Sequence, residues 1–247
     1  MKLYSDLAEY YYDIEKTNRS FQEEIGFVNT LFQKHKVRSI VDLGCGTGEH
    51  VTALQSMGYK VIGIDSSVSM LEIAKRRFPD CHFQTGLIQG FQAKQTFDAA
   101  LCIFGTFNYL VDNEDIESAL IKLKQNLKPV GIAVFEIWNS YPIQQIKRKP
   151  ITTVSMTKIG KTIVKRNRGF RIAAEEESKT IVEVNYIYHL DNKEIKDKHV
   201  MRVFSFSEIA QLLNKFQFQI LNIYASYSME KFKQDSLRMI LVIKTPP

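Results

Sequence analysis

The sequence predicts an α/β fold in which a mainly parallel sheet has helices on both faces and carries an inserted antiparallel β block. Two observations support this prediction. Along residues 1–140, short apolar runs alternate with segments of helical period, a pattern typical of parallel strands joined by helices. Between residues 141 and 204, strand-like runs follow one another directly, which is typical of antiparallel strands. We therefore divide the chain into a core of residues 1–140 and 205–247 and a β insertion of residues 141–204.

The composition of the 247 residues is that of a globular protein, with 45% hydrophobic and 24% charged residues. No apolar run approaches the ~20 residues that a membrane-spanning helix needs, and the acidic, aromatic N-terminus does not resemble a signal peptide. We therefore expect a cytoplasmic protein without a membrane partner. The three cysteines lack CxxC spacing and the five histidines are scattered, so we expect no metal site.

The net charge of the chain favours anionic partners. It is +6 at pH 7, and the basic residues concentrate after Gln144, in the β insertion. Such a positive charge is consistent with binding of nucleic acid, with binding of a phosphorylated metabolite, or with a role in solubility alone. The net charge does not distinguish these three possibilities.

Two helices are expected before the first strand. Apolar and aromatic residues recur at helical spacing at residues 5–16 and again at about residues 20–35. Because both segments precede the first strand, they cannot be crossover helices of a parallel sheet. We expect them to lie across its open end.

The stretch Ile40–His50, which reads IVDLGCGTGEH, combines a buried strand, a glycine turn and the start of a helix. Residues 40–43 form the apolar strand. Glycines at positions 44, 46 and 48 accept positive φ and let backbone amides approach a ligand closely. Apolar residues then return at helical spacing, so the free N–H groups of a helix face the same crevice. Together these features predict a nucleotide-type pocket.

A second apolar run, at residues 60–64, ends in Asp65, about twenty residues beyond the glycine turn. A carboxylate at this place suits a ribose, because two hydroxyl groups can donate to one carboxylate. The glycine spacing is GxGxG and not the GxGxxG of dinucleotide-binding proteins, which disfavours a nicotinamide cofactor.

The remaining core elements follow from the same periodicities. In order, they are a helix at 68–78 capped by Ser66 or Ser67, strands at 81–86 and 97–103, a helix at 113–127, and a turn with a fifth strand within 127–138. Ligands of open α/β sheets bind beyond the carboxyl ends of the strands, near the point where the strand order reverses. We therefore expect cofactor and substrate to meet at residues 104–109, in the segment FGTFNYL.

Five strand-like runs in the insertion predict an antiparallel meander that covers the mouth of the pocket and supplies substrate walls. The runs are TTVSMTK, KTIVKRNR, FRIAAE, KTIVEVNYIYHL and EIKDKHVMRVFSF. After the insertion we expect a serine-capped helix at 205–216 and an antiparallel pair of strands at 218–226 and 237–244.

These elements resemble the class I S-adenosylmethionine-dependent methyltransferases. VDLGCGTG matches the first motif of that family, Asp65 matches its ribose-binding acid, and FDAALCIFGTFNYL matches a later motif. The resemblance implies a Rossmann-like seven-stranded sheet and the cofactor S-adenosylmethionine, which becomes S-adenosylhomocysteine. We assign to the cofactor site Asp42, Gly44, Cys45, Gly46, Gly48, Asp65, Ser66, Met70, Leu87, Ile88 and Phe104.

The resemblance also marks two departures and one further residue. The family binds the adenine amino group with Asp or Asn after the third strand, but Leu87 and Ile88 stand here, so we expect backbone groups and apolar contact to hold adenine. Most relatives have glycine where Val130 stands, so we expect an altered turn before the fifth strand. A tyrosine covers the cofactor in the family, and Tyr12 matches it; the alternative is that residues 10–12 only pack.

A closer similarity exists to the amino-sugar N,N-dimethyltransferases. It rests on Tyr12-Asp13, FGTFNYL, FEIW, VEVNYIY and SLRMILV, although the family histidine is Tyr109 here and the family proline is Ile137. The similarity implies N-methylation of a small-molecule amine, such as a nucleotide-linked amino sugar. Our catalytic candidates are Tyr12, Tyr109 and Glu136. Of these, we expect Tyr109 and Glu136 to orient that amine or to accept its proton. For Glu136, a purely structural role is the alternative.

Substrate binding is assigned to aromatic, amide and basic residues near the expected mouth: Asn108, Trp138, Arg168, Tyr186 and Arg238. Guanidinium groups match phosphate oxygens, so Arg238 and three insertion arginines, Arg166, Arg168 and Arg171, suit a diphosphate. Acidic residues 175–177 follow directly, so the alternative is that this basic run is a solvated hairpin.

Two further functions stay open. The charge favours an RNA or protein methyltransferase, although the (N/D)PP(Y/F) tetrad of nucleic-acid amine methyltransferases is absent after the fourth strand, which disfavours a nucleic-acid substrate. Leu87 keeps open a partner subunit that binds S-adenosylmethionine without catalysis. We also consider an oligomer formed through the β insertion.

Overall fold

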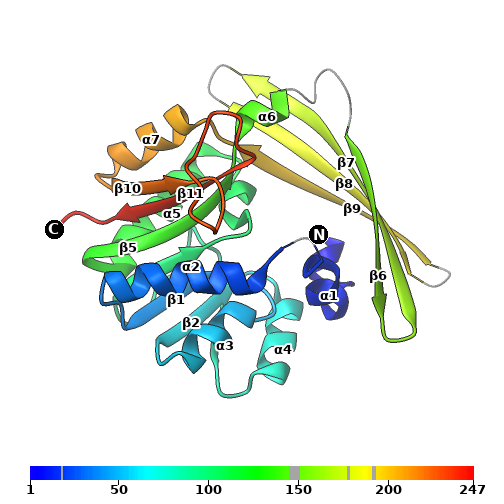
Figure 1. The fold of residues 1–247 in the computed structure, drawn as a ribbon, viewed down its shortest axis with the longest axis horizontal. Coiled ribbons are helices and arrows are strands. Elements are labelled where there is room, and N and C mark those ends of the chain that lie inside the picture. Colours follow the sequence, from blue (N-terminus) through cyan, green and yellow to red (C-terminus); the bar gives the residue numbers. More distant parts are fainter. Residues whose placement is uncertain (18, 145–150, 177–178, 191–192) are drawn as a thin grey trace.

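The computed structural model describes residues 1–17, 19–144, 151–176, 179–190 and 193–247. These residues form two sheets (Figure 1): one of seven strands in the order β10-β11-β5-β4-β1-β2-β3, and one of four in the order β6-β7-β8-β9. The predicted α/β fold with an inserted antiparallel sheet is confirmed. Parts of the charged runs expected in the insertion, residues 147–149 and 177, lie outside the described residues.

The larger sheet has a parallel centre and an antiparallel edge. Its parallel strands are β1 (Ser39–Leu43), β2 (Lys60–Asp65), β3 (His82–Thr85), β4 (Phe97–Cys102) and β5 (Leu127–Trp138). Strands β11 (Arg238–Lys244) and β10 (Gln219–Tyr224) extend the sheet in antiparallel pairing beyond β5. The strand order reverses between β1 and β4, so the carboxyl ends of these strands flank the crevice in which ligands of such sheets bind.

Helices bury apolar residues against each face of this sheet. They are α2 (Phe21–Lys34), α3 (Glu49–Ser56), α4 (Val68–Arg77), α5 (Asn113–Asn126) and α7 (Phe206–Lys215). Residues of α2 and α3 pack with one face, and residues of α5 and α7 pack with the other. The predicted serine caps are present, because Ser67 and Ser205 each accept a hydrogen bond from the backbone amide three residues later. Among the described residues, no helix combines the length and the apolar character needed to cross a membrane.

The N-terminal segment differs from the single helix expected at residues 5–16. It consists of two 3₁₀ turns, η1 (Lys2–Tyr4) and η2 (Ala8–Tyr10), and the short helix α1 (Tyr11–Glu15). Leu3 and Leu7 pack with the second sheet, whereas Ala8 packs with Met70 of α4. A regular helix presents one apolar stripe, so a segment that packs against two surfaces bends between them. The segment therefore lies between the core and the second sheet (Figure 1).

The second sheet is an antiparallel meander of four strands where five runs were expected. Its strands are β6 (Thr152–Ile159), β7 (Thr162–Glu176), β8 (Lys179–Leu190) and β9 (Lys193–Val203). Two of the expected runs join in β7, because Gly169 stays in register with Thr152 on one side and Asn185 on the other. A short helix that the sequence did not predict, α6 (Ser140–Gln144), precedes the sheet. The division into a core and an insertion stays our interpretation.

The turn before the buried part of β5 has a left-handed backbone at Val130, the residue for which the sequence predicts an altered turn. This valine has a φ of 57° and is 51% exposed. Left-handed backbone brings Cβ too close to the carbonyl oxygen, and a β-branched residue tolerates it poorly. The conformation lets the Val130 amide donate to the carbonyl of Pro246 at 3.2 Å. A side chain thus stands where the backbone geometry favours glycine.

Replacing Val130 with glycine is expected to raise the free energy of unfolding by about 1 kcal/mol. The left-handed conformation costs an ordinary residue about 1–2 kcal/mol, and the greater entropy of an unfolded glycine cancels only part of that gain. Urea denaturation measures the change, with Val130→Ala as a control that keeps a Cβ atom. A glycine variant less stable than the alanine variant would contradict the strain at this turn.

Candidate functional site

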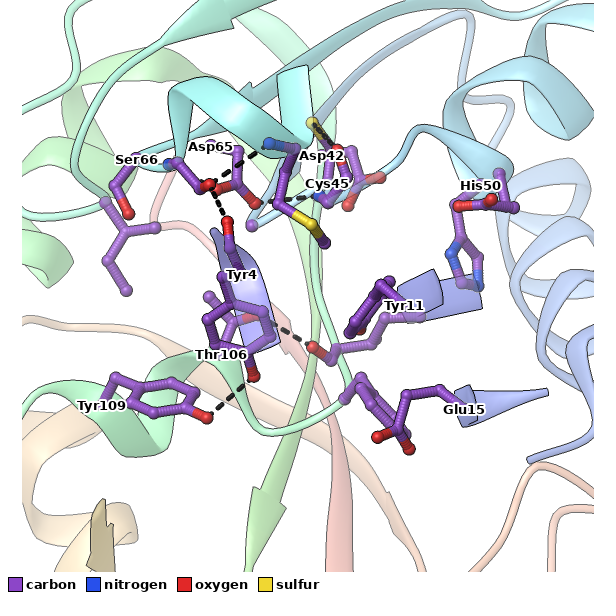
Figure 2. A pocket seen from close by; sticks show the side chains of 18 of the residues that line it. Tyr4, Tyr11, Glu15, Asp42, Cys45, His50, Asp65, Ser66, Thr106 and Tyr109 are labelled. Carbon is purple, nitrogen blue, oxygen red and sulfur yellow. Dashed lines mark hydrogen bonds between the residues drawn. The ribbon is translucent and has the colours of Figure 1, made fainter. Parts of the chain in front are cut away.

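A cavity of about 500 Å³ lies at the carboxyl ends of β1, β2 and β4. Its walls are the glycine turn, the end of β2, the loop at residues 86–89, the segment after β4 and the N-terminal segment (Figure 2). This volume is within the range of small-molecule sites. The cavity therefore occupies the place that the strand order marks for a ligand.

The glycine turn is fastened to the end of β2 by three backbone amides. The amides of Gly44 and Cys45 donate to the carbonyl of Ile64 at 2.7 and 3.0 Å, and the amide of Gly46 donates to Asp65 Oδ2 at 2.8 Å. Gly44 has a φ of 78°, and a Cβ atom there would lie 2.4 Å from the side chain of Thr106. Glycine is required because the turn approaches the segment after β4 too closely for any side chain.

Asp65 faces the cavity and retains room to accept further hydrogen bonds. Its Oδ1 accepts from the amide of Ser67 at 2.8 Å, and its Oδ2 accepts from Gly46. Burial raises the pKa of this carboxyl, and the backbone hydrogen bonds only partly oppose that rise. Each carboxylate oxygen has two lone pairs, so one remains free on each oxygen. Asp65 can therefore accept from two ligand hydroxyl groups.

Asp42 is a second carboxyl group at the cavity wall, and one of its oxygens has no protein partner. The residue is 2% exposed, and its Oδ2 has no hydrogen-bond partner among the described residues. Burial, reinforced by the charge of Asp65 and opposed by His50, raises the pKa of Asp42 to about 6. A buried polar atom of this kind is stabilised when a ligand supplies the missing donor.

Arg19 supplies a cation at the cavity wall. Its guanidinium lies 4.1 Å from the centroid of the Phe104 ring, and its Nε donates to Glu24 Oε1 at 2.8 Å. Glu24 also contacts His50 Nε2 at 3.0 Å, so the carboxylate is held from two sides. A buried charge held in this way keeps a fixed position. The cavity wall thus contains a fixed guanidinium as well as two carboxyl groups.

Glu136 lies outside the cavity and is hydrogen-bonded to Phe104, a residue of the cavity wall. Its carboxylate accepts from the amide of Phe104 at 3.0 Å, from the Tyr227 hydroxyl at 2.5 Å and from Arg238 at 2.9 Å. Phe104 and Gly105 both have left-handed φ angles, of 56° and 73°, and strain of this kind clusters at functional sites. Glu136 does not line the cavity, so its position favours the structural alternative.

Of the other predicted residues, most line the cavity and some do not. Those that line it are Tyr12, Asp42, Gly44, Cys45, Gly46, Asp65, Ser66, Met70, Leu87, Ile88, Phe104 and Tyr109. Those outside it, with Glu136, are Gly48, Asn108, Trp138, Arg168, Tyr186 and Arg238.

The residues outside the cavity have visible structural contacts. Gly48 caps helix α3, and Asn108 is buried, donating to the carbonyl of Arg202 and accepting from the amide of Trp138. Arg238 is paired with Glu136, which accounts for its charge without a phosphate. These residues therefore lie outside this cavity, and their assignment to a ligand stays a prediction.

The insertion arginines differ in their partners. Arg166 is paired with Glu15 at 2.6 Å, and Arg171 is paired with Glu183. The Arg168 guanidinium lies 4.2 Å from the centroid of the Phe170 ring and 5.4 Å from that of Trp138. A diphosphate therefore does not find three free arginines side by side.

Sequence reasoning missed several residues that line the cavity: Tyr4, Tyr11, Glu15, Arg19 and His50. Three of them, Tyr4, Tyr11 and Glu15, belong to the N-terminal segment, whose path depends on both the core and the second sheet. A run of tyrosines before a first strand was a signal for a cover over the site. No local pattern marked Arg19.

Residues 40–131 match the family model described as a methyltransferase domain. The chain is 29% identical over 136 residues to dTDP-3-amino-3,6-dideoxy-α-D-glucopyranose N,N-dimethyltransferase of Streptomyces fradiae, covering 54% of this chain and 53% of the relative. It is 32% identical over 122 residues to dTDP-4-amino-2,3,4,6-tetradeoxy-D-glucose N,N-dimethyltransferase of Saccharopolyspora spinosa, covering 49% of each. The chain thus spans about half the length of the curated relatives it matches.

A solved structure extends the similarity over the whole chain. The S-adenosylmethionine-dependent methyltransferase from Clostridium acetobutylicum superposes with a TM-score of 0.78 at 18% identity, covering 99% of both chains. This likeness concerns the fold. With the family match, it confirms the resemblance seen in the sequence.

The carboxyl group of Asp42 is expected to titrate in the folded protein with a midpoint of about 6, well above its ordinary pKa of 3.8. The folded state therefore holds this proton more tightly than the unfolded state. The resulting stability is complete below about pH 4 and is lost as the pH rises through about 6. Carbon-detected NMR of the aspartate carboxyl groups measures the midpoint.

Asp98 is the matched control for this titration. Burial raises the pKa of Asp98, but hydrogen bonds from Lys128 and from the backbone of Arg38 and Ser39 outweigh it and lower the pKa to about 2. A midpoint for Asp42 near 3.8 would show that this carboxyl group is hydrated, contrary to its burial.

Proposed function

We propose, from the class I S-adenosylmethionine-dependent methyltransferase fold of this chain, that it binds S-adenosylmethionine in the cavity and transfers the methyl group to a small molecule. The observation that carries this proposal is the pairing of a ribose-type acid with a bare glycine turn. Asp65 and the turn are hydrogen-bonded to each other, and both face the cavity.

The residues present fit such a cofactor by their chemistry. The free lone pairs of Asp65 suit the two ribose hydroxyl groups. The cofactor also contains an amino acid part, whose carboxylate suits the guanidinium of Arg19 and whose ammonium suits Asp42 with its unpartnered oxygen. Leu87 and Ile88 offer apolar surface for the adenine. The bound cofactor would supply an electrophilic methyl group on a sulfonium.

The protein contributes position and exclusion of water. Methyl transfer is an in-line displacement in which the acceptor atom attacks the methyl carbon opposite the departing sulfur. Holding two reactants in line is worth about 7–11 kcal/mol of the barrier, so no covalent enzyme intermediate is needed. Tyr4, Tyr11 and Tyr12 of the N-terminal segment line the cavity and limit the access of water. Their rings also suit a neighbouring sulfonium cation.

For the acceptor, we propose an amine, such as that of a nucleotide-linked amino sugar. The two relatives named above are both N,N-dimethyltransferases of dTDP-linked amino sugars. Tyr109 stands at the cavity wall where it can orient an amine. We propose a cytoplasmic location for such a reaction, because nucleotide-linked sugars are soluble intermediates. The alternative to an enzyme is a non-catalytic partner subunit. Observed methyl transfer to an acceptor would exclude that alternative.

S-adenosylhomocysteine is expected to bind the protein, and Asp65→Ala is expected to weaken binding about 100-fold, because two hydrogen bonds to a charged group are lost. Isothermal titration calorimetry measures both affinities. Asp98→Ala is the matched control, because Asp98 accepts from the backbone of Arg38 and Ser39, remote from the cavity. Equal affinity of the wild type and Asp65→Ala would refute the ribose assignment.

With S-adenosylmethionine present, dTDP-3-amino-3,6-dideoxy-α-D-glucopyranose is expected to gain methyl groups on its amine. Mass spectrometry follows the gain, and the corresponding 3-hydroxy sugar nucleotide is the control, since it lacks the amine. Binding of S-adenosylhomocysteine without turnover on a broad panel of amines would favour the non-catalytic alternative. Methylation of RNA in preference to every amine would overturn the small-molecule proposal.

A further inference from the structure

A chain of hydrogen bonds leads from the cavity wall into the second sheet. The hydroxyls of Tyr4 and Tyr109 lie 2.8 Å apart, as Figure 2 shows. The Tyr109 hydroxyl lies 2.6 Å from His199 Nδ1, and His199 Nε2 lies 2.9 Å from Asp197 Oδ2. Tyr4 belongs to η1, Tyr109 to η3 (Thr106–Tyr109), and the other two residues to β9. Three segments far apart in the sequence thus build one chain of polar groups.

With a neutral His199 imidazole, the direction of each hydrogen bond in this chain follows from the Asp197 carboxylate. Burial raises the pKa of its carboxyl, but the hydrogen bond from His199 and those from the Leu3 and Lys2 backbone outweigh burial and hold the pKa well below its usual range. An ionised carboxylate only accepts, so His199 donates to it through Nε2. In a neutral imidazole, Nδ1 is then the acceptor, and the Tyr109 hydroxyl donates to it. The Tyr4 hydroxyl, 2.8 Å away, then donates to the Tyr109 oxygen, which keeps one further lone pair.

The inner part of the chain is closed to water, and its outer part faces the cavity. His199 is 1% exposed and Asp197 is 8% exposed, whereas Tyr4 and Tyr109 line the cavity. The rings of Tyr186 and Tyr4 lie 4.9 and 5.3 Å from the His199 ring, between centroids. A proton that reaches His199 therefore finds the Asp197 carboxylate and not solvent.

This arrangement has the logic of an acid–base triad. A hydroxyl group contacts an imidazole, and a buried carboxylate fixes the tautomer and orientation of that imidazole. Within the described part of the chain, the ionisable groups that contact His199 are Tyr4, Tyr109, Tyr186 and Asp197. Beyond Tyr186 stands the guanidinium of Arg166, 5.8 Å from the centroid of the tyrosine ring and itself paired with Glu15.

We propose that Tyr109, His199 and Asp197 form a proton relay that removes the proton of the acceptor amine during methyl transfer. The inference rests on the proposed function. The amine nitrogen forms a bond to the methyl carbon as the carbon–sulfur bond breaks, and the sulfur keeps the electron pair. The N–H proton of the resulting ammonium passes to the Tyr109 oxygen, while the Tyr109 hydroxyl proton passes to His199 Nδ1. One proton has left the amine, and His199 is an imidazolium beside a carboxylate.

The relay also explains why the N-terminal segment is fastened to β9. The backbone amide of Leu3 donates to Asp197 Oδ2 at 2.7 Å, the same oxygen that accepts from His199. Tyr4, the next residue, contacts Tyr109. The segment that covers the cavity and the carboxylate that orients the relay therefore depend on each other.

The tautomer of His199 tests the relay without any acceptor. In histidine-labelled protein, nitrogen-15 NMR is expected to show His199 as a neutral imidazole with its proton on Nε2 and a hydrogen-bonded Nδ1. Tyr109→Phe is expected to shift Nδ1 to the position of a free ring nitrogen, and Asp197→Asn to move the proton away from Nε2. A proton on Nδ1 in the wild type would overturn the relay.

Turnover gives the second test. With the dTDP-amino sugar, His199→Gln and Asp197→Asn are expected to lower kcat about 100-fold, in the range of general base catalysis. The pH profile of kcat should lose its acid limb in His199→Gln. The control is His82→Gln, on the exposed strand β3. Unchanged kcat and pH profile in both relay variants would overturn the proposal.

Binding of S-adenosylhomocysteine distinguishes failure of the proposed function from failure of the relay. His199→Gln is expected to keep wild-type affinity, because His199 does not line the cavity and does not hold the N-terminal segment through its backbone. Loss of binding in the wild type would overturn the proposed function, whereas normal binding with unchanged turnover in the variants would overturn only the relay. If the sugar nucleotide is not an acceptor, the NMR result alone decides the relay.

Discussion

The fastening of the glycine turn to the end of β2 is the constraint on which the rest of the site depends. Three amides of the turn point at the Ile64 carbonyl and the Asp65 carboxylate, so the turn and the acid cannot move independently. The same fastening brings Gly44 against Thr106, and hence the turn against the segment after β4. The strand ends of β1, β2 and β4 thereby form one rigid floor, and the chemistry of a ligand on that floor is set by Asp42, Asp65 and Arg19.

Over this floor lies a cover that the two sheets hold in common. The N-terminal segment is hydrogen-bonded to the core through Ser67 Oγ and the carbonyl of Tyr4, and to β9 through Leu3 and Asp197. Its apolar residues pack against both surfaces. Docking of a short segment with few regular hydrogen bonds depends on tertiary packing, so the cover orders only when core and second sheet are both in place. Position, water exclusion and the polar chain at Tyr109 follow from that docking.

The sequence predicted the floor well and the cover poorly. Gly44 and Asp65 could be recognised because each sits at a strand end, where local periodicity fixes its place. Glu136 was a candidate for chemistry, but the pairing with Arg238 and Tyr227 joins residues about a hundred positions apart, which no local pattern reveals. Arg19 reaches the site because of the path that the chain takes after the N-terminal segment. His199 lies near the site because of the register of β9 in the second sheet. Long-range packing, and not propensity, decides both.

The central claim is that the glycine turn and the N-terminal segment form a single binding site for the methyl donor. Amide hydrogen exchange with and without S-adenosylhomocysteine tests it most directly, since it reports each backbone amide separately. The account predicts slower exchange at Gly44, Cys45 and Gly46 together with Leu3, whose amide holds the cover to Asp197. Slower exchange in only one of these two segments, or in neither of them, would contradict a single shared binding site.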